Sequence, residues 1–307
     1  MIDKQKLIVK NPFTNNKVGE ISLKSKFEIS TILETAYNAK YELTSIERSR
    51  ILDKAADIYN KNIYDEALLI TKEAGICIKQ AIYEVERSIN ALKYASFHAK
   101  KLDDKDFSSE YITEDDNLNV DLEVIVEPYD LAIAITPFNH PLNQLIHKIA
   151  PAIAAGTSII LKPSEKTPLC AYRLREILTA SGLPEDVFMV LNGYDVIDTV
   201  KQLVTYEKLD VVSFTGSVKV GRSIEQIMNK NGNTLKKYIP ELGGNAALYV
   251  ADDADFDWGT GDFTVELWGK ATWTSNSNDG LVSAANATTG DGFLFRVDGD
   301  STGRIEV

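Results

Sequence analysis

Short apolar runs alternate with longer amphipathic segments through most of the first 250 residues. Residues 45–71 and 79–99 carry apolar side chains at helical spacing. From residue 131 onward, the apolar runs are LAIAIT, TSIILKP, VFMVLN, VVSFTG and NAALYV. Such short, strongly apolar runs are typical of strands buried on both faces of a parallel sheet. Segments 141–155, 168–181 and 217–229 are the predicted crossover helices, so the pattern indicates an α/β fold.

Two regions depart from this alternation of strand and helix. VDLEVIVEPY, at residues 120–129, alternates between apolar and polar side chains over most of its length and predicts a strand. Beyond residue 257, GDFTVELW and GFLFRVDG alternate in the same way and are separated by Asn, Ser and Gly residues typical of turns. We therefore expect a short antiparallel β segment at the end of the chain.

The amino-acid composition changes abruptly at about residue 257. All 13 tyrosines lie at or before Tyr249, whereas all three tryptophans, beginning with Trp258, lie after the change. Lys270 is the only lysine in the last 50 residues. A change this sharp predicts two domains of different origin, residues 1–257 and residues 258–307.

Charge and residue types exclude several classes of protein. The net charge of -12 disfavours nucleic acid or an anionic membrane as a main partner. The start of the chain lacks an apolar signal core, and no apolar run is long enough to span a bilayer, which predicts a cytoplasmic protein. The two cysteines, Cys77 and Cys170, and the three histidines have no metal-ligand spacing, so we expect no metal site.

Five motifs occur in a fixed order between residues 134 and 244: ITPFNHPLN, IILKPSEKTP, LNGY, SFTGSVKVG and ELGG. Together, on this alternation of strands and helices, they make residues 8–257 resemble the aldehyde dehydrogenase superfamily, with closest similarity to lactaldehyde-type branches. The resemblance implies a Rossmann-like cofactor domain with N-terminal helices and NAD(P)-dependent oxidation of a small aldehyde to a carboxylic acid. It also implies a homo-oligomer in which a strand at about residues 119–129 takes part, although the family's final oligomerisation strand is missing from this chain.

In SFTGSVKVG, the strand is expected to end at Phe214, and Thr215 and Gly216 turn the chain. Ser217 is then the predicted N-cap of the following helix. The free N–H groups and positive dipole end of a helix N-terminus suit a phosphate, although spacing alone also fits a simple glycine turn. The resemblance assigns this turn to the cofactor.

In IILKPSEKTP, the strand brings Lys162 and Glu165 to the carboxyl edge of the sheet. By resemblance these two residues hold the adenosine ribose; without it, a solvated surface ion pair is the simpler interpretation. The charge of Glu165 repels a 2′-phosphate, which favours NAD over NADP. Gly193 of LNGY matches a glycine close to the cofactor, or is an ordinary loop glycine. The predicted cofactor-binding residues are Ile135, Thr136, Pro137, Phe138, Lys162, Ser164, Glu165, Gly193, Phe214, Thr215, Gly216, Ser217, Leu242 and Gly243.

Two residues are candidates for the chemistry. The amide of Asn139 can donate to an oxyanion, and the carboxylate of Glu241 can act as a general base. The resemblance gives them these roles; the alternatives are a turn asparagine and a surface glutamate. The family's reaction also needs a cysteine thiolate some thirty residues after the glutamate, and no cysteine follows Cys170. Ser275 lies at about that distance, without an adjacent base. We therefore expect a truncated or chimeric chain that does not oxidise aldehydes.

The last 50 residues resemble the beginning of a concanavalin-like or laminin-G-like β-sandwich, mainly through GDFTVELW. The segment is too short for a complete sandwich. An alternative function follows: a noncatalytic nucleotide-binding or scaffold protein with a C-terminal glycan-binding-like module.

Overall fold

The computed structural model describes residues 5–39, 43–102, 127–230 and 236–244, and the backbone of residues 279–285, 292–297 and 305–306. The chain divides into two compact units, Met1–Gly243 and Gly244–Val307. The first contains nearly all of the predicted site residues, and its centre is a parallel sheet.

The sheet of the first unit contains five strands in the order β5-β4-β3-β6-β7, and every neighbouring pair is parallel. The strands are β3 (Leu131–Ile135), β4 (Ser158–Lys162), β5 (Phe188–Val190), β6 (Val211–Gly216) and β7 (Lys237–Leu242). The chain builds outward from β3 through β4 and β5, then returns to the other side of β3. This is a doubly wound sheet, and the direction of winding changes between β3 and β6.

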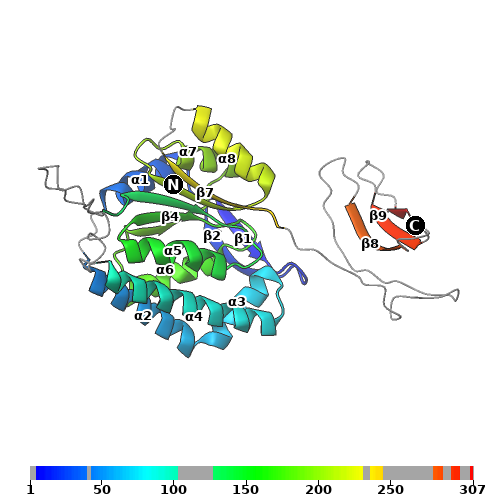
Figure 1. The fold of residues 1–307 in the computed structure, drawn as a ribbon, viewed down its shortest axis with the longest axis horizontal. Helices are drawn as coiled ribbons and strands as arrows, with labels where there is room; N and C mark the ends of the chain where they lie inside the picture. The colour runs from blue at the N-terminus through cyan, green and yellow to red at the C-terminus, as the bar shows by residue number, and fades with distance from the viewer. Residues whose placement is uncertain are drawn as a thin grey trace, which may run out of the picture. The chain divides into compact units, whose positions relative to one another are not determined.

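Helices cover both faces of this sheet, as Figure 1 shows. On one face lie α1 (Lys26–Asn38), α7 (Val196–Val204) and α8 (Val218–Lys230). On the other lie α5 (Asn143–Ala155) and α6 (Leu169–Ser181), packed in turn against α2 (Ser45–Lys61), α3 (Ile63–Ala74) and α4 (Ile78–Lys101). Each face of the sheet has its own hydrophobic core, and side chains of β3 alternate between them. Leu131 and Ile133 pack in the core with α1, α7 and α8, whereas Ala132 packs in the core with α5 and α6.

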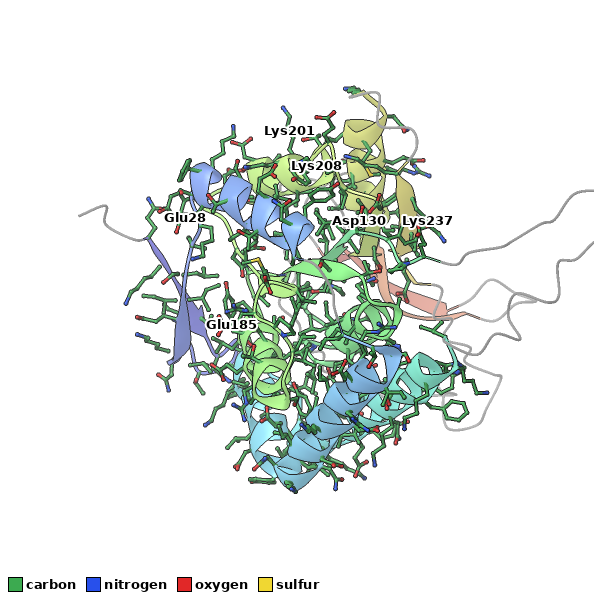
Figure 2. The ribbon with its side chains drawn as sticks, turned by 90° about the vertical axis from the view of Figure 1, so that its left-hand side faces the viewer. Glu28, Asp130, Glu185, Lys201, Lys208 and Lys237 are labelled. Carbon is green, nitrogen blue, oxygen red and sulfur yellow. The ribbon has the colours of Figure 1, made fainter. Side chains whose placement is uncertain are left out.

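An N-terminal hairpin of β1 (Lys6–Lys10) and β2 (Lys17–Ser22) precedes α1, and the sequence pattern did not predict it. Both α1 and α2 begin with a capping box, with Ser25 and Thr44 as the N-caps. Lys208 lies beside α7 and α1 at the surface (Figure 2), where its Nζ is 3.2 Å from Glu34 of α1. This ion pair links α1 to the segment that precedes β6.

Several predicted boundaries are corrected. The helical pattern of residues 45–71 forms two helices, because the chain leaves helical geometry at Asn62. Strand β6 continues past Phe214 to Gly216, because its last two residues pair with Glu241 and Leu242 of β7. β7 itself was not predicted: Pro240 breaks the strand pattern, and it is tolerated because β7 lies at the edge of the sheet.

The second unit contains β8 (Asp279–Ala285), β9 (Gly292–Val297) and β10 (Ile305–Glu306). They form an antiparallel sheet in the order β10-β9-β8, which confirms the antiparallel pattern of GFLFRVDG. The predicted strands at GDFTVELW and NAALYV lie outside the described residues. So do residues 120–126 of the predicted oligomerisation strand, while residues 127–129 belong to no helix or strand.

Candidate cofactor and catalytic site

The predicted site residues gather at the carboxyl edge of the parallel sheet. Ile135, Lys162, Gly216 and Leu242 each end a strand, and the other predicted residues stand in or just before the loops that follow. In a doubly wound sheet, ligands bind in the crevice outside the carboxyl ends of the strands, where the winding direction changes. That position lies between β3 and β6, so Asn139 and the turn at Gly216 follow the two strands that flank it.

An ion pair stands at the end of β4. The Nζ of Lys162 lies 2.5 Å from Oε1 of Glu165 and also donates to the carbonyl of Pro163. The side chain of Lys162 is almost fully buried, whereas that of Glu165 is 30 % exposed. The amide of Asn192, just after β5, donates to the same Oε1 over 3.2 Å. The carboxylate is therefore held from two strands while it still faces solvent.

The N-terminus of α8 begins directly after β6. The hydroxyl of Ser217 accepts from the backbone N–H of Val220, which confirms Ser217 as the N-cap. Gly243 has a φ of +66° and donates its N–H to the carbonyl of Gly216, which ties the ends of β6 and β7 together. This geometry requires a residue that tolerates left-handed backbone.

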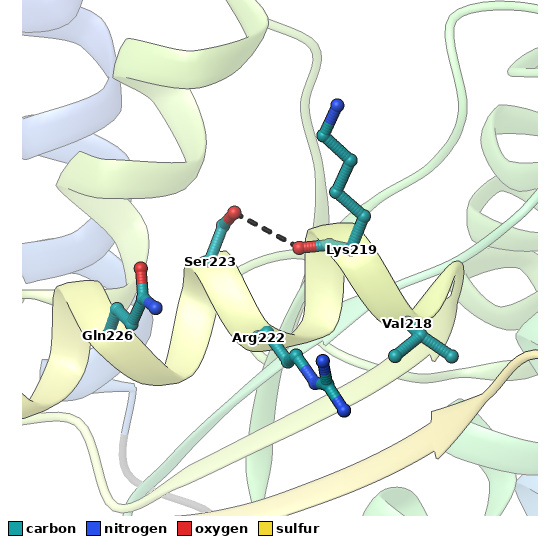
Figure 3. A pocket seen from close by; sticks show the side chains of 5 residues that line it. All are labelled: Val218, Lys219, Arg222, Ser223 and Gln226. Atoms are coloured by element: carbon teal, nitrogen blue, oxygen red, sulfur yellow. Dashed lines mark hydrogen bonds between the residues drawn. The ribbon is translucent and has the colours of Figure 1, made fainter. Parts of the chain in front are cut away.

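A hollow of about 480 Å³ lies along α8. Figure 3 shows its lining side chains, which come from successive turns of the helix: Val218, Lys219, Arg222, Ser223 and Gln226. Two of the five are cationic, which suits an anionic ligand. A larger hollow of about 750 Å³ lies between α4 and α5, and none of the predicted site residues lines it.

The loop that carries Asn139 is anchored on one side by a buried carboxylate. Glu84 of α4 accepts from the backbone N–H groups of Leu142 and Asn143 over 2.9 and 3.0 Å. Its other oxygen lies 3.2 Å from Nδ1 of His140. Asn139 is itself exposed, so its amide is accessible while the backbone that follows it is fixed.

Phe138 stands next to Asn139 and is half exposed. The Nζ of Lys166 lies 4.1 Å from the centroid of its ring, a cation–π contact between the loops after β3 and β4. In the same loop, the hydroxyl of Thr136 is buried without a hydrogen-bond partner among the described residues. This edge of the sheet therefore combines an exposed aromatic ring with a buried hydroxyl to which the described residues offer no partner.

Glu241 lies next to last in β7, opposite Thr215 of β6. The hydroxyl of Thr215 donates to Oε2 of Glu241 over 3.0 Å. Lys148 of α5 donates to the hydroxyl of Ser213, two residues earlier on the same face of β6. Burial lowers the pKa of Lys148 to about 8, and the charge of Glu241 acts in the opposite direction. Lys148 can therefore exchange a proton near neutral pH beside the candidate base.

The structure supplies a packing reason for Gly193. A Cβ at this position would clash with Oγ1 of Thr199 and lie 3.1 Å from Cδ1 of Ile29. Contact with α1 and α7 is therefore enough to require glycine here, independently of any cofactor.

The two cysteines stand in different surroundings. Cys170 is buried at the start of α6, where its backbone N–H donates to Glu73, and burial raises the pKa of its thiol well above the usual value. Cys77 is exposed at the N-cap of α4, in the outer helical layer. In the part of the chain that the structure describes, no group of three or more His, Cys, Asp or Glu side chains is arranged to hold a metal ion.

Three residues of this site were not predicted from the sequence: Glu84, Lys148 and Asn192. Lys148 had a detectable signal, since it is the one residue with a full charge in the apolar helix α5. Asn192 stands in the LNGY motif, but its role was not predicted, because its partners lie 27 to 29 positions away in the chain. Glu84 had no signal, because its partners lie 56 to 59 positions away.

The sheet topology and the helices on both of its faces define an α/β protein of the doubly wound class. The aldehyde dehydrogenase family model matches residues 2–263, and the chain belongs to this family. The match begins and ends a few residues outside the range 8–257 expected from the motifs.

Relatives of known activity are similar over the same region. The chain is 37% identical over 263 residues to a lactaldehyde dehydrogenase of Methanococcus aeolicus, covering 83% of this chain and 54% of the relative. It is 35% identical over 254 residues to a 3-sulfolactaldehyde dehydrogenase of Priestia megaterium, covering 82% and 52%. The chain thus spans about half the length of the curated relatives it matches.

Solved structures agree on the fold. A succinate-semialdehyde dehydrogenase from Burkholderia pseudomallei superimposes with a TM-score of 0.71 at 30% identity, covering 82% of this chain and 51% of the other. A glyceraldehyde-3-phosphate dehydrogenase from Methanocaldococcus jannaschii, solved with NADP, gives a TM-score of 0.64 at 32% identity, covering 80% and 52%. An aldehyde dehydrogenase from Sinorhizobium meliloti, described as NAD-dependent, gives a TM-score of 0.69 at 28% identity, covering 78% and 47%. These similar structures include both coenzymes, so the likeness does not choose between NAD and NADP.

Proposed function

We propose that this chain binds NAD at the carboxyl edge of its parallel sheet, as the cofactor-binding half of an aldehyde dehydrogenase, and that the 307-residue chain alone does not oxidise aldehydes. The observation that carries the proposal is the carboxylate of Glu165. Its Oε1 is held by Lys162 and Asn192, and among the described residues no hydrogen bond reaches its Oε2. A fixed, partly exposed carboxylate oxygen suits a ribose hydroxyl and repels a 2′-phosphate, which favours NAD over NADP.

The nicotinamide ring, when bound, supplies the acceptor for a hydride. The residues of this chain provide the groups that act on the aldehyde and on water. The amide of Asn139 can donate to the oxygen of an aldehyde as negative charge develops on it. Glu241, held by Thr215, can remove a proton from water, and Lys148 beside it can exchange a proton near neutral pH. The substrate class that these groups suit is a small polar aldehyde, in line with the names of the similar relatives.

The group that this chain does not supply is the nucleophile of the reaction. Of the two cysteines in the sequence, Cys170 is held as a buried thiol and Cys77 lies in the outer helical layer. Ser275 lies outside the described residues. Without a thiolate beside Asn139 and Glu241, the chain lacks the covalent step on which hydride transfer and thioester hydrolysis depend. We therefore assign it cofactor binding without turnover, and treat it as a truncated or chimeric member of the family.

Isothermal titration of the full chain with NAD, together with NADH absorbance in the presence of lactaldehyde and other small aldehydes, tests this function. We expect saturable NAD binding and no turnover above trace level. Absence of NAD binding would overturn the cofactor assignment. Steady NADH formation would show that a nucleophile is present and would refute the assignment as an inactive chain.

The C-terminal segment supports a second, separate proposal: a glycan-binding-like module of concanavalin or laminin-G type. Its antiparallel strands β8, β9 and β10 are compatible with part of such a sandwich. A glycan array probed with the full chain tests this, and an array without selective binding argues against it. Sequencing of one native DNA fragment across the codons for residues 240–270 would separate a natural fusion from a sequence-assembly error.

The remaining expectations are a cytoplasmic location, a homo-oligomer and no nucleic-acid partner. In the described ranges, no helix combines the length and apolar character needed to cross a membrane. The oligomeric state is measurable by light scattering during size-exclusion chromatography.

A further inference from the structure

We propose that Asn192 is a positioning residue for Glu165, and that it sets the preference of this site for NAD over NADP. The inference rests on the proposed cofactor function. It concerns a residue that does not itself contact the nucleotide, but orients the carboxylate that does.

Asn192 is held rigidly by its own backbone. It stands two residues after the end of β5, is fully buried, and its carbonyl accepts from the N–H of Lys24 over 2.8 Å. The preceding residue, Leu191, donates its N–H to the carbonyl of Leu161 in β4. The amide side chain therefore projects from a fixed point between β5 and the loop after β4.

The amide makes two hydrogen bonds, and both use its N–H₂ group. Nδ2 donates to the carbonyl of Pro163 over 3.1 Å and to Oε1 of Glu165 over 3.2 Å. Rotating the amide by half a turn would place Oδ1 against two other acceptors, so the chemistry of the neighbours determines this orientation. Oδ1 is buried and has no partner among the described residues. A buried acceptor without a partner is unfavourable. The two hydrogen bonds that the N–H₂ group donates therefore account for an asparagine at this position.

The two donors on Glu165 act together. Lys162 approaches Oε1 from β4 and Asn192 approaches it from the end of β5. Two donors from different strands restrict rotation of the carboxylate about its last bond, whereas one donor leaves it free to turn. A fixed carboxylate keeps Oε2 available for the hydroxyl of a ribose and keeps negative charge where a 2′-phosphate would lie. Loss of Asn192 should therefore weaken NAD binding and relax the rejection of NADP.

Titration calorimetry of the full chain with NAD and with NADP tests the inference. Two variants remove the donors: Asn192→Ala, and Asn192→Leu, which retains the volume of the side chain. We expect the Kd for NAD to rise about tenfold while the Kd for NADP stays unchanged or falls, so that the preference for NAD shrinks by at least that factor. Gln202→Ala is the matched control, because this amide of α7 donates to the carbonyl of Lys26 and the hydroxyl of Ser30 in α1 and not to Glu165.

A double-mutant cycle with Glu165→Gln separates positioning from general damage. If Asn192 acts through Glu165, Asn192→Ala should have little further effect on the NAD and NADP affinities once Glu165 has lost its charge. Melting temperatures of all variants identify any that fail to fold, in which case the other Asn192 variant decides. Independent, additive effects, or an unchanged ratio of the two Kd values in a folded variant, would overturn the inference while leaving the proposed function intact. If the unmodified chain binds neither nucleotide, the proposed function itself fails and the inference fails with it.

Discussion

The buried carboxylate of Glu84 should be one of the larger single contributions to the stability of the first unit. Glu84 lies on α4, is 3 % exposed, and accepts from the N–H groups of Leu142 and Asn143 at the beginning of α5. These N–H groups have no partner within the helix, because they stand in its first turn. Substitution Glu84→Ala leaves both of them buried and unpaired.

The expected loss follows from the number and type of these bonds. A hydrogen bond to a charged group contributes about 1.5–3 kcal/mol, and a buried donor left without an acceptor costs a similar amount. Two such N–H groups give an expected loss of about 3–5 kcal/mol for Glu84→Ala, allowing for non-additivity. Glu84→Gln retains a carbonyl acceptor at nearly the same place, so its loss should be about 1–2 kcal/mol.

Urea unfolding followed by circular dichroism measures these losses, and hydrogen exchange locates them. The amides of Leu142 and Asn143 should exchange faster in Glu84→Ala than in the unmodified chain. Glu86 lies two residues further along the same helix and is exposed, so Glu86→Ala is the control and should change the free energy of unfolding by no more than about 0.5 kcal/mol. The reasoning is refuted if Glu84→Ala costs no more than this control, or if exchange at the two amides is unchanged.

Two further substitutions test the electrostatics and the packing of the site. Burial lowers the pKa of Lys148 from an ordinary value of 10.5 to about 8 in the folded chain. Between these two pH values the unfolded chain therefore binds more protons than the folded chain. The free energy of unfolding should rise with pH in that window, relative to a Lys148→Met variant. Parallel stability curves for the two proteins from pH 8 to pH 10.5 would contradict the lowered pKa. Gly193→Ala should lower stability by about 1–3 kcal/mol through its clash with Thr199, and Thr199→Ala should restore part of the loss; a melting temperature equal to that of the unmodified chain would show that packing does not require this glycine.

The parallel strands β3, β4, β5 and β6 could be predicted because burial on both faces leaves a direct trace in the sequence. Each is a short apolar run between polar turns, and the crossover helices α5, α6 and α8 begin within two residues of their predicted starts. β7 could not be recognised this way. Its side chains are mostly exposed and it contains Pro240, and it is a strand only because β6 provides hydrogen-bond partners.

For the predicted site residues, too, the sequence predicts the location but not the surroundings. Asn139, Glu165 and Ser217 stand in motifs directly after strands, so their place at the carboxyl edge follows from the order of strands and helices alone. Their surroundings do not follow from it. Glu84, Lys148 and Asn192 act on residues or segments remote in the chain, and the packing of α4, α5 and β5 brings them there.

The amino-acid sequence was sufficient for the class of fold, the family and the placement of the predicted site residues at one edge of the sheet, since local patterning and the order of motifs encode all three. The reasons why these residues hold their positions came from the folded chain. The direction of a carboxylate, the pKa of a lysine and the need for a glycine depend on burial and on partners from other elements. Glu241 illustrates both parts: its motif marks it as a candidate base, but its hydrogen bond to Thr215 exists only because β6 and β7 lie side by side.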